Sequence, residues 1–331
     1  MELLNVDIIS KEMIKPSSPT PNHFRNLKLS FLDQISPQVN RHIDCNDAGA
    51  EFIEARVDAR LIQVIKEPRT EELQQLLPVE PLGQTDDKAI LSVKISFFNC
   101  GGIAIGEAED IQPSFDLAFH FPPKDLFGFG ITPNVGASKE KITTKRLVFD
   151  KKKLTKLKQV AASGEVKNPT RVEALLAFIW HHYIQATRAK MNTQNITSFA
   201  AVPADSFGNC WRAAFAILSQ TEDSYDLVTK LRYAIAEIDD GYIKKLLYED
   251  YLSNLSRRID FFKKDIQVDF GWGKPVWVCT TTLPFKNLVI LMGSLSRNGI
   301  EAWVNVPDDD LEMLETHYKQ LNAVNSVDMD A

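Results

Sequence analysis

The chain has few cysteines and no excess of positive charge, and both shortages narrow its possible functions. Its 331 residues carry 38 basic and 44 acidic side chains, a formal net charge of −6. This balance provides no polycationic surface for a phosphate backbone, so we expect no nucleic-acid partner. The cysteines are too few and too widely spaced for a zinc knuckle or a disulfide-rich secreted domain. There are four of them: Cys45, Cys100, Cys210 and Cys279.

Long apolar segments are also missing. The N-terminal stretch interrupts its apolar residues with Asp7, Lys11 and Glu12, which is unlike the apolar core of a signal peptide. No segment approaches the roughly 18 consecutive apolar residues of a membrane-spanning helix. We therefore expect a cytoplasmic protein without a membrane partner.

Several common catalytic motifs are absent as well. There is no Gly-x-Ser-x-Gly and no His-Glu-x-x-His, and the adjacent His181 and His182 lack the i, i+4 spacing of a zinc pair. We expect no metal site. The tripeptide at 269–271 matches the magnesium-binding motif of protein kinases, but the catalytic loop that a kinase needs upstream is missing.

The composition that remains is that of a globular protein, with 44% apolar and 25% charged residues. Strands and helices alternate without a repeating unit, which indicates an α/β or α+β fold with mixed sheets. Period-two alternation and apolar runs predict strands at 4–9, 51–57, 90–97, 103–105, 145–149, 276–282, 288–292 and 300–306. Helical spacing predicts helices at 151–162, from 171 onward, and at 223–238, 241–262 and 307–322.

Two helix starts have explicit sequence signals. Asp150 is a predicted N-cap, and Thr170 with Glu173 forms a predicted capping box. Before them, residues 122–144 are rich in Gly, Pro and Lys without periodicity, which is typical of a linker. The sequence thus predicts an N-terminal domain at 1–121, a crossover linker at 122–144 and a C-terminal domain at 145–331.

A heptapeptide near the C-terminus is specific enough to suggest a family. The segment Asp269-Phe270-Gly271-Trp272-Gly273-Lys274-Pro275 resembles the signature of the plant BAHD acyltransferases. The similarity continues in blocks along nearly the whole chain, and it is greatest to the branch that acetylates hydroxyl groups of alkaloids. The other blocks are Lys15 to Pro21, Leu32 to Gln34, Asp44 to Phe52, Cys100 to Gly102, Asn168 to Glu173 and Gly299 to Trp303.

The resemblance implies a fold and a reaction. Two domains, each a mixed sheet with flanking helices, would form a chloramphenicol-acetyltransferase-like fold around a channel, in a monomer. The co-substrates would be an acyl-CoA such as acetyl-CoA and a small hydroxylated acceptor, with no bound cofactor. The family's base is the His of a His-x-x-x-Asp motif. The resemblance gives a structural role to Asp269, Phe270, Gly271, Trp272 and Gly273, and it allows Thr280, Thr281 and Thr282 to face the channel.

At the catalytic position the chain departs from the family. None of its six histidines has an Asp four positions later. In the family the motif follows the strand after Cys-Gly-Gly, so the missing segment would fall between Gly106 and Glu107. Further segments are missing between 37 and 41 and after Val202. We therefore expect an incomplete, truncated fold that is inactive in acyl transfer. The alternative is a non-catalytic remnant that binds CoA or a partner.

Three origins would each produce such joins. They are a truncated splice product, an incorrect gene structure and an incomplete sequence of a normal enzyme. The sequence is compatible with all three.

Overall fold

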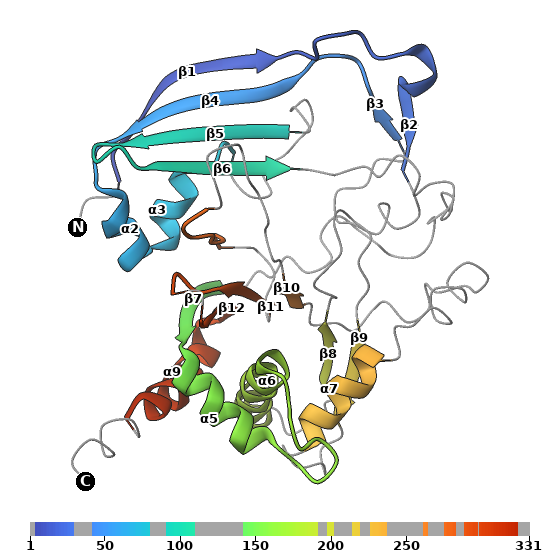
Figure 1. The fold of residues 1–331 in the computed structure, drawn as a ribbon, viewed down its shortest axis with the longest axis vertical. Coiled ribbons are helices and arrows are strands. Elements are labelled where there is room, and N and C mark those ends of the chain that lie inside the picture. Colours follow the sequence, from blue (N-terminus) through green and yellow to red (C-terminus); the bar gives the residue numbers. More distant parts are fainter. Residues whose placement is uncertain are drawn as a thin grey trace. The chain divides into compact units, whose positions relative to one another are not determined.

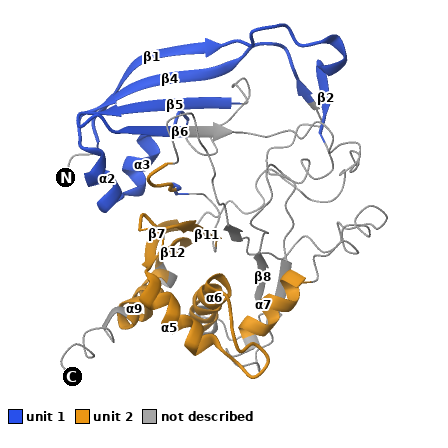
Figure 2. Ribbon diagram, in the orientation of Figure 1, with its two compact units in different colours: residues 1–136, 206–211, 280–284 blue, residues 137–205, 212–279, 285–331 orange. Residues whose placement is uncertain are grey.

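The chain forms two compact units (Figures 1 and 2). Unit 1 comprises residues 1–136, 206–211 and 280–284, and unit 2 comprises 137–205, 212–279 and 285–331. Most of the predicted linker lies outside the described residues, so the predicted domain boundaries stay a prediction. The computed structural model describes residues 4–29, 42–79, 91–109, 142–190, 197–201, 214–218, 226–236, 261–263, 275–282, 288–296 and 298–323.

Unit 1 contains a four-stranded mixed sheet in the order β1-β4-β5-β6. β1 and β4 are antiparallel, β4 and β5 are parallel, and β5 and β6 form an antiparallel hairpin. A parallel pair needs a crossover connection, and here the crossover contains two short helices, α2 (Leu61–Lys66) and α3 (Thr70–Gln75). The strands are β1 (Val6–Ile14), β4 (Ala50–Val57), β5 (Leu91–Phe98) and β6 (Ile103–Glu109).

Three short elements complete the description of this unit. A 3-10 turn, η1 (Asn22–Phe24), precedes β2 (Asn26–Lys28), which pairs with β3 (His42–Asp44). Asp47 stabilises the segment around Thr20, because its carboxylate accepts a hydrogen bond from the backbone N–H of Thr20 at 3.0 Å.

β5 buries the face that carries its polar side chains, although the sequence alone would place that face at the surface. Its fully buried side chains include Ser92, Lys94 and Ser96. The apolar residues that alternate with them are half-buried, and Phe97 is 39% exposed. The hydrogen bond from Lys94 Nζ to the carbonyl of Gln75, 2.8 Å long, shows that the polar face lies against the end of α3. The alternation in β5 therefore predicts a strand correctly but does not predict which face is buried.

Unit 2 is built on a second four-stranded sheet, in the order β10-β11-β12-β7. The predicted strands at 145–149, 288–292 and 300–306 and the predicted helices at 151–162, from 171, at 223–238 and at 307–322 are confirmed within a few residues. A separate antiparallel pair joins β8 to β9. The elements are β7 (Ile142–Phe149), α5 (Lys151–Ala161), α6 (Arg171–Lys190), β8 (Thr197–Ala201), β9 (Ala214–Leu218), α7 (Asp226–Ala236), β10 (Phe261–Lys263), β11 (Leu288–Gly293), β12 (Ile300–Pro307) and α9 (Asp308–Ala323).

One predicted strand is wrong. Residues 275–282 are described and form no strand. Pro275, at the start of the segment, has no N–H to donate to a ladder, and Trp277 is held by its indole rather than by backbone pairing. The predicted helix at 241–262 lies almost wholly outside the described residues, and its last two positions belong to β10.

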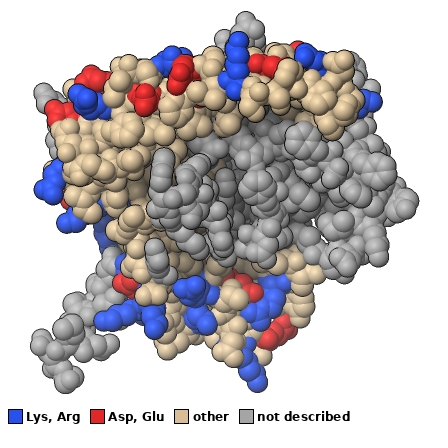
Figure 3. Space-filling view, turned by 45° about the horizontal axis from the view of Figure 1, so that its top comes forward, with Lys and Arg blue, Asp and Glu red and all other residues tan. Residues whose placement is uncertain are grey.

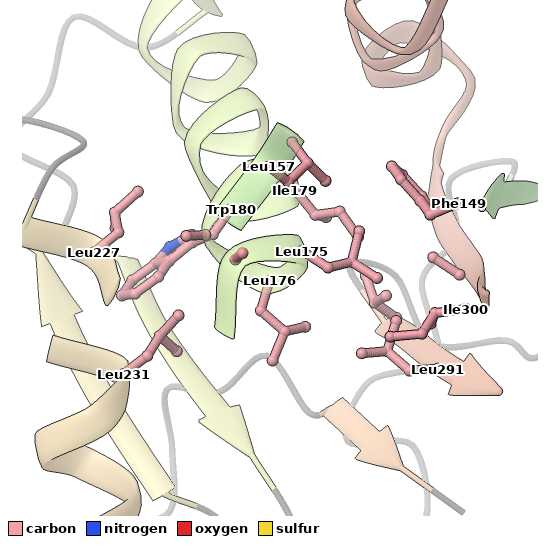
Figure 4. Close-up of a cluster of buried hydrophobic side chains, with 14 of the residues drawn as sticks. Phe149, Leu157, Leu175, Leu176, Ile179, Trp180, Leu227, Leu231, Leu291 and Ile300 are labelled. Atoms are coloured by element: carbon pink, nitrogen blue, oxygen red, sulfur yellow. The ribbon is translucent and has the colours of Figure 1, made fainter. Parts of the chain in front are cut away.

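The core of unit 2 lies between its sheet and α6. Trp180 of α6 is 1% exposed and points toward Leu227 and Leu231 of α7 (Figure 4). On the sheet side, Leu175 of α6 belongs to the same cluster as Phe149 at the end of β7. Burying a large apolar side chain contributes roughly 1.5–3 kcal/mol, so α6 is the central packing element of this unit.

The capping box at the start of α6 is confirmed. The backbone N–H of Glu173 donates to Thr170 Oγ1 at 3.1 Å, and the N–H of Thr170 donates to Glu173 Oε2 at 2.6 Å. Arg232 of α7 donates to both oxygens of Glu173, at 2.9 and 2.7 Å. Burial alone would raise the pKa of Glu173, but the bonds from Arg232 and Thr170 outweigh it and lower the pKa. One carboxylate thus caps α6 and attaches α7 to it.

The edge strand β7 is closed by a tyrosine from α9. The hydroxyl of Tyr318 donates to the carbonyl of Val148 at 2.7 Å and accepts from its N–H at 3.1 Å. Lys153 Nζ donates to the same hydroxyl at 3.2 Å. An unpaired strand edge is a template for pairing with another chain, and this hydroxyl satisfies both backbone groups of one edge residue.

Replacing Tyr318 with phenylalanine tests this edge contact. Tyr318→Phe leaves the N–H of Val148 without its partner, while the carbonyl keeps the hydrogen bond from Lys153 Nζ at 2.9 Å. The change is expected to destabilise unit 2 by about 1–3 kcal/mol. Urea denaturation monitored by circular dichroism measures the change. Tyr233→Phe is the matched control, because Tyr233 is 63% exposed on α7 and its loss should be nearly neutral. Equal effects of the two variants would contradict the edge-closing role.

Candidate functional site

β6 occupies the position where the catalytic segment is expected. The strand runs without interruption through Gly106 and Glu107, which pair with Lys94 and Val93 of β5. The bond between Gly106 and Glu107, where the sequence predicts that a segment is missing, therefore lies within a regular strand of a sheet. The hairpin before it turns at Gly101, whose φ of +78° favours glycine.

Gly106 packs tightly against α3. The backbone carbonyl of Leu76, just after α3, lies where a Cβ on residue 106 would stand. Any other residue at this position would have to displace the backbone of the helix end. This close approach allows Lys94, the neighbour of Gly106 on β5, to reach the carbonyl of Gln75.

Lys94 is the one buried amine near this position that the described residues provide. Burial lowers its pKa, which would favour a basic role, but its Nζ already donates to a helix-end carbonyl. That bond holds the amine against the end of α3. Lys94 therefore serves the packing of the crossover helices.

The residues named from the resemblance divide into two groups. Asp269, Phe270, Gly271, Trp272 and Gly273 lie outside the described residues. Thr280, Thr281 and Thr282 are described, and Thr281 is buried at 7% exposure. Thr280 donates to the carbonyl of Thr281 at 3.4 Å. Their predicted place in a channel stays a prediction.

A buried ion pair on the sheet of unit 2 is the strongest polar feature there, and the sequence analysis missed it. Arg146 of β7 donates to both carboxylate oxygens of Glu301 on β12, at 2.8 and 2.7 Å. Glu301 is 0% exposed. The indole N–H of Trp277 donates to the same carboxylate at 3.2 Å, and Arg146 lies over the Trp277 ring at 5.3 Å from its centroid. The sequence signal that could have identified both partners is a charged residue within a buried strand.

Breaking this pair should be costly. Glu301→Gln leaves the half-buried guanidinium of Arg146 without its counter-charge, and losing one partner of a buried pair costs roughly 3–5 kcal/mol. Urea denaturation of the variant measures the loss. Arg146→Met combined with Glu301→Met should recover part of the stability, because no charge is then left buried. Glu312→Gln, at an exposed position of α9, is the control, and an equal effect of this control would contradict the assignment.

The buried pair also sets the chemistry of Cys279. Burial, and then the charge of Glu301, raise the pKa of this thiol to about 12. Cys100, in the β5–β6 turn, is exposed. Backbone N–H groups of Leu61 and Gly102 lower the pKa of Cys100. The two cysteines should therefore differ widely in reactivity, since the thiolate is the reactive form.

Alkylation of the native protein checks this difference. At pH 7.5 iodoacetamide should modify Cys100 at least ten times faster than Cys279, as read by peptide mass spectrometry. Denaturation should remove the difference. Equal native rates would show that Cys279 is accessible, against the packing described here.

Metal and membrane features are few in the part of the chain that the structure describes. No group of three or more His, Cys, Asp or Glu side chains there could hold a metal ion. Among the same residues no helix is both long enough and apolar enough to cross a bilayer. On the face drawn in Figure 3, basic and acidic side chains of the described residues are interspersed.

Comparison with known proteins assigns the family. The chain matches the model of the Transferase family over residues 4–43, 40–110, 107–202 and 262–321. It therefore belongs to this family, the plant BAHD acyltransferases, which are acyl-CoA-dependent enzymes of specialised metabolism. The family assignment made from the heptapeptide and its accompanying blocks is confirmed.

Two relatives align with this chain over nearly their whole length. Stemmadenine O-acetyltransferase of Catharanthus roseus is 34% identical, with 96% of this chain and 97% of that protein aligned. Vinorine synthase of Rauvolfia serpentina is 33% identical, with 92% and 95% aligned. The crystal structure of vinorine synthase superposes with a TM-score of 0.76 at 30% identity, covering 96% of this chain and 98% of that one. The predicted α/β, chloramphenicol-acetyltransferase-like fold with mixed sheets is confirmed.

A more distant structure shows the same fold. Fusarium graminearum TRI101, solved with coenzyme A and deoxynivalenol, superposes with a TM-score of 0.60 at 14% identity, covering 95% of this chain and 94% of that one.

The alignment is longer than the chain. It runs over 418 positions for stemmadenine O-acetyltransferase, whereas the chain has 331 residues, so at least 87 positions hold no residue of this chain. The relatives are covered from end to end, and the unmatched positions are therefore largely internal.

Proposed function

We propose that this chain is a non-catalytic member of its family, which can bind acyl-CoA and a small hydroxylated acceptor but does not transfer the acyl group. The observation that carries the proposal is the absence of His-x-x-x-Asp from all 331 residues. The corresponding reaction of a complete member would be acetyl transfer from acetyl-CoA to the hydroxyl of an alkaloid-like alcohol.

The chemistry explains why one missing side chain matters. The acceptor hydroxyl must lose its proton as its oxygen attacks the thioester carbonyl carbon. A histidine base takes that proton and then returns it to the departing CoA sulfur as the carbon–sulfur bond breaks. A positioned general base contributes typically 10²–10⁴-fold to the rate. Without it, the bound alcohol stays protonated and is a poor nucleophile.

The surroundings of the join support the proposal. β6 passes through Gly106 and Glu107 as a paired strand, and the nearby Lys94 is held by a helix-end carbonyl. The boundaries between matched family segments also fall at 40–43, at 107–110 and after 202. These positions are close to the three joins predicted from the sequence.

A paired measurement of turnover and binding tests the proposal. The purified chain is mixed with acetyl-CoA and an alkaloid alcohol, and free CoA thiol is followed with vinorine synthase as the active control. We expect release at the buffer rate, at least 10²-fold below the control. Calorimetry with CoA alone should still detect binding.

Each outcome decides a different part of the proposal. Turnover above the buffer rate contradicts the non-catalytic assignment, and loss of that turnover in Lys94→Met would identify the replacement base. Neither turnover nor CoA binding would contradict ligand recognition and would leave a protein partner as the alternative.

A further inference from the structure

Two histidines meet where the C-terminal helix packs on the central helix of unit 2. The rings of His182 on α6 and His317 on α9 are stacked, with centroids 4.0 Å apart and planes inclined by 10°. Phe178, one turn earlier on α6, contacts the His182 ring edge-on at 4.3 Å. His182 Nδ1 is buried and has no hydrogen-bond partner within the described part of the chain. The arrangement suits a His182 ring that carries no charge.

Among the residues that the structure describes, no carboxylate acts as a counter-charge for a proton on His182. Burial, followed by His317 and His181, lowers the pKa of His182 from 6.5 to about 3. Several described charged groups on the neighbouring elements are paired with one another or with Tyr318: Glu315 with Lys145 and Lys319, Lys153 with Tyr318, and Glu173 with Arg232.

We propose that the stacked His182–His317 pair is a pH-sensitive latch that holds α9 on unit 2 at neutral pH and loosens its docking under mildly acidic conditions. The latch is independent of acyl transfer and of ligand binding. Release would also withdraw Tyr318 from Val148 and so open the edge of β7.

The direction of the effect follows from proton linkage. His182 has a lower pKa in the docked state than in an exposed chain, so the undocked state binds more protons. Docking is therefore fully favoured above pH 6.5 and weakens as the pH falls from 6.5 toward 3. From His182 alone, the undocking constant should rise roughly 30-fold between pH 7.5 and pH 5.0.

The ion pair on the same helix does not produce this change. A hydrogen bond from Lys145 lowers the pKa of Glu315 below its usual 4.5, so its carboxylate stays ionised at pH 5.0. A weakening of α9 docking between pH 7.5 and pH 5.0 therefore reports on the histidines rather than on Glu315.

Hydrogen exchange of the whole chain tests the latch. Amide exchange in α9 is measured by mass spectrometry at pH 7.5 and pH 5.0 and corrected for the intrinsic pH dependence. We expect the opening constant of 308–323 to rise roughly 30-fold, while that of β12 changes less than three-fold. His182→Phe keeps a stacking ring that cannot be protonated, and it should abolish the rise.

His23→Phe is the matched control, because His23 lies in unit 1 in an exposed turn. It should behave as the unaltered chain does. An opening constant of α9 that changes less than three-fold in the unaltered chain overturns the proposal. The proposal also fails if His182→Phe keeps the full pH dependence.

A second measurement avoids any variant that fails to fold. Nuclear magnetic resonance of the imidazole nitrogens in the unaltered chain follows the titration of His182 directly. The latch requires that His182 stays neutral at pH 5.5 in molecules with α9 docked. Titration of that ring near pH 6.5 with α9 still docked would overturn it.

Discussion

The ion pair between Arg146 and Glu301 is the constraint on which unit 2 depends. A fully buried carboxylate is tolerated only when its charge and hydrogen-bonding capacity are satisfied. Here one guanidinium bonds both carboxylate oxygens, and the Trp277 indole donates to the same group. The pair therefore fixes the register of β7 against β12, and it also holds the segment that precedes Thr280. The opposite face of the same sheet carries Leu147, Phe149 and Ala302, which belong to the apolar cluster that packs on α6.

Local signals explain which parts of the fold were predictable. The capping box of Thr170 and Glu173 and the N-cap Asp150 are interactions across three residues, and the structure contains both. The face of β5 that is buried was not predictable, because alternation gives a period but does not identify the side on which a neighbour lies. The Arg146–Glu301 pair was not predictable for a similar reason, since its partners are 155 positions apart and their meeting depends on the order of strands.

The candidate site also divides into features that the sequence predicts and features that only the structure shows. The heptapeptide was sufficient to assign the family, yet all of it except Pro275 lies outside the described residues, and its role rests on resemblance. The absence of the histidine base could be established from the sequence alone, because the motif is a fixed pattern of residues. The packing around Gly106 could not be predicted from the sequence. Only the fold shows that the carbonyl of Leu76 lies where a side chain at residue 106 would stand. A strand step at this position explains how the sheet of unit 1 is continuous without the catalytic segment.

The inverted burial of β5 has a consequence for the life of the protein in a cell. Phe97 of β5 and Ile103 of β6, which are Cα partners, are 39% and 43% exposed. Apolar strand surface that remains accessible after folding is what chaperones and quality-control proteases recognise. Local opening of the β5–β6 hairpin would add to this exposed apolar surface, so a small loss of stability in unit 1 is expected to lower the amount of the protein in a cell.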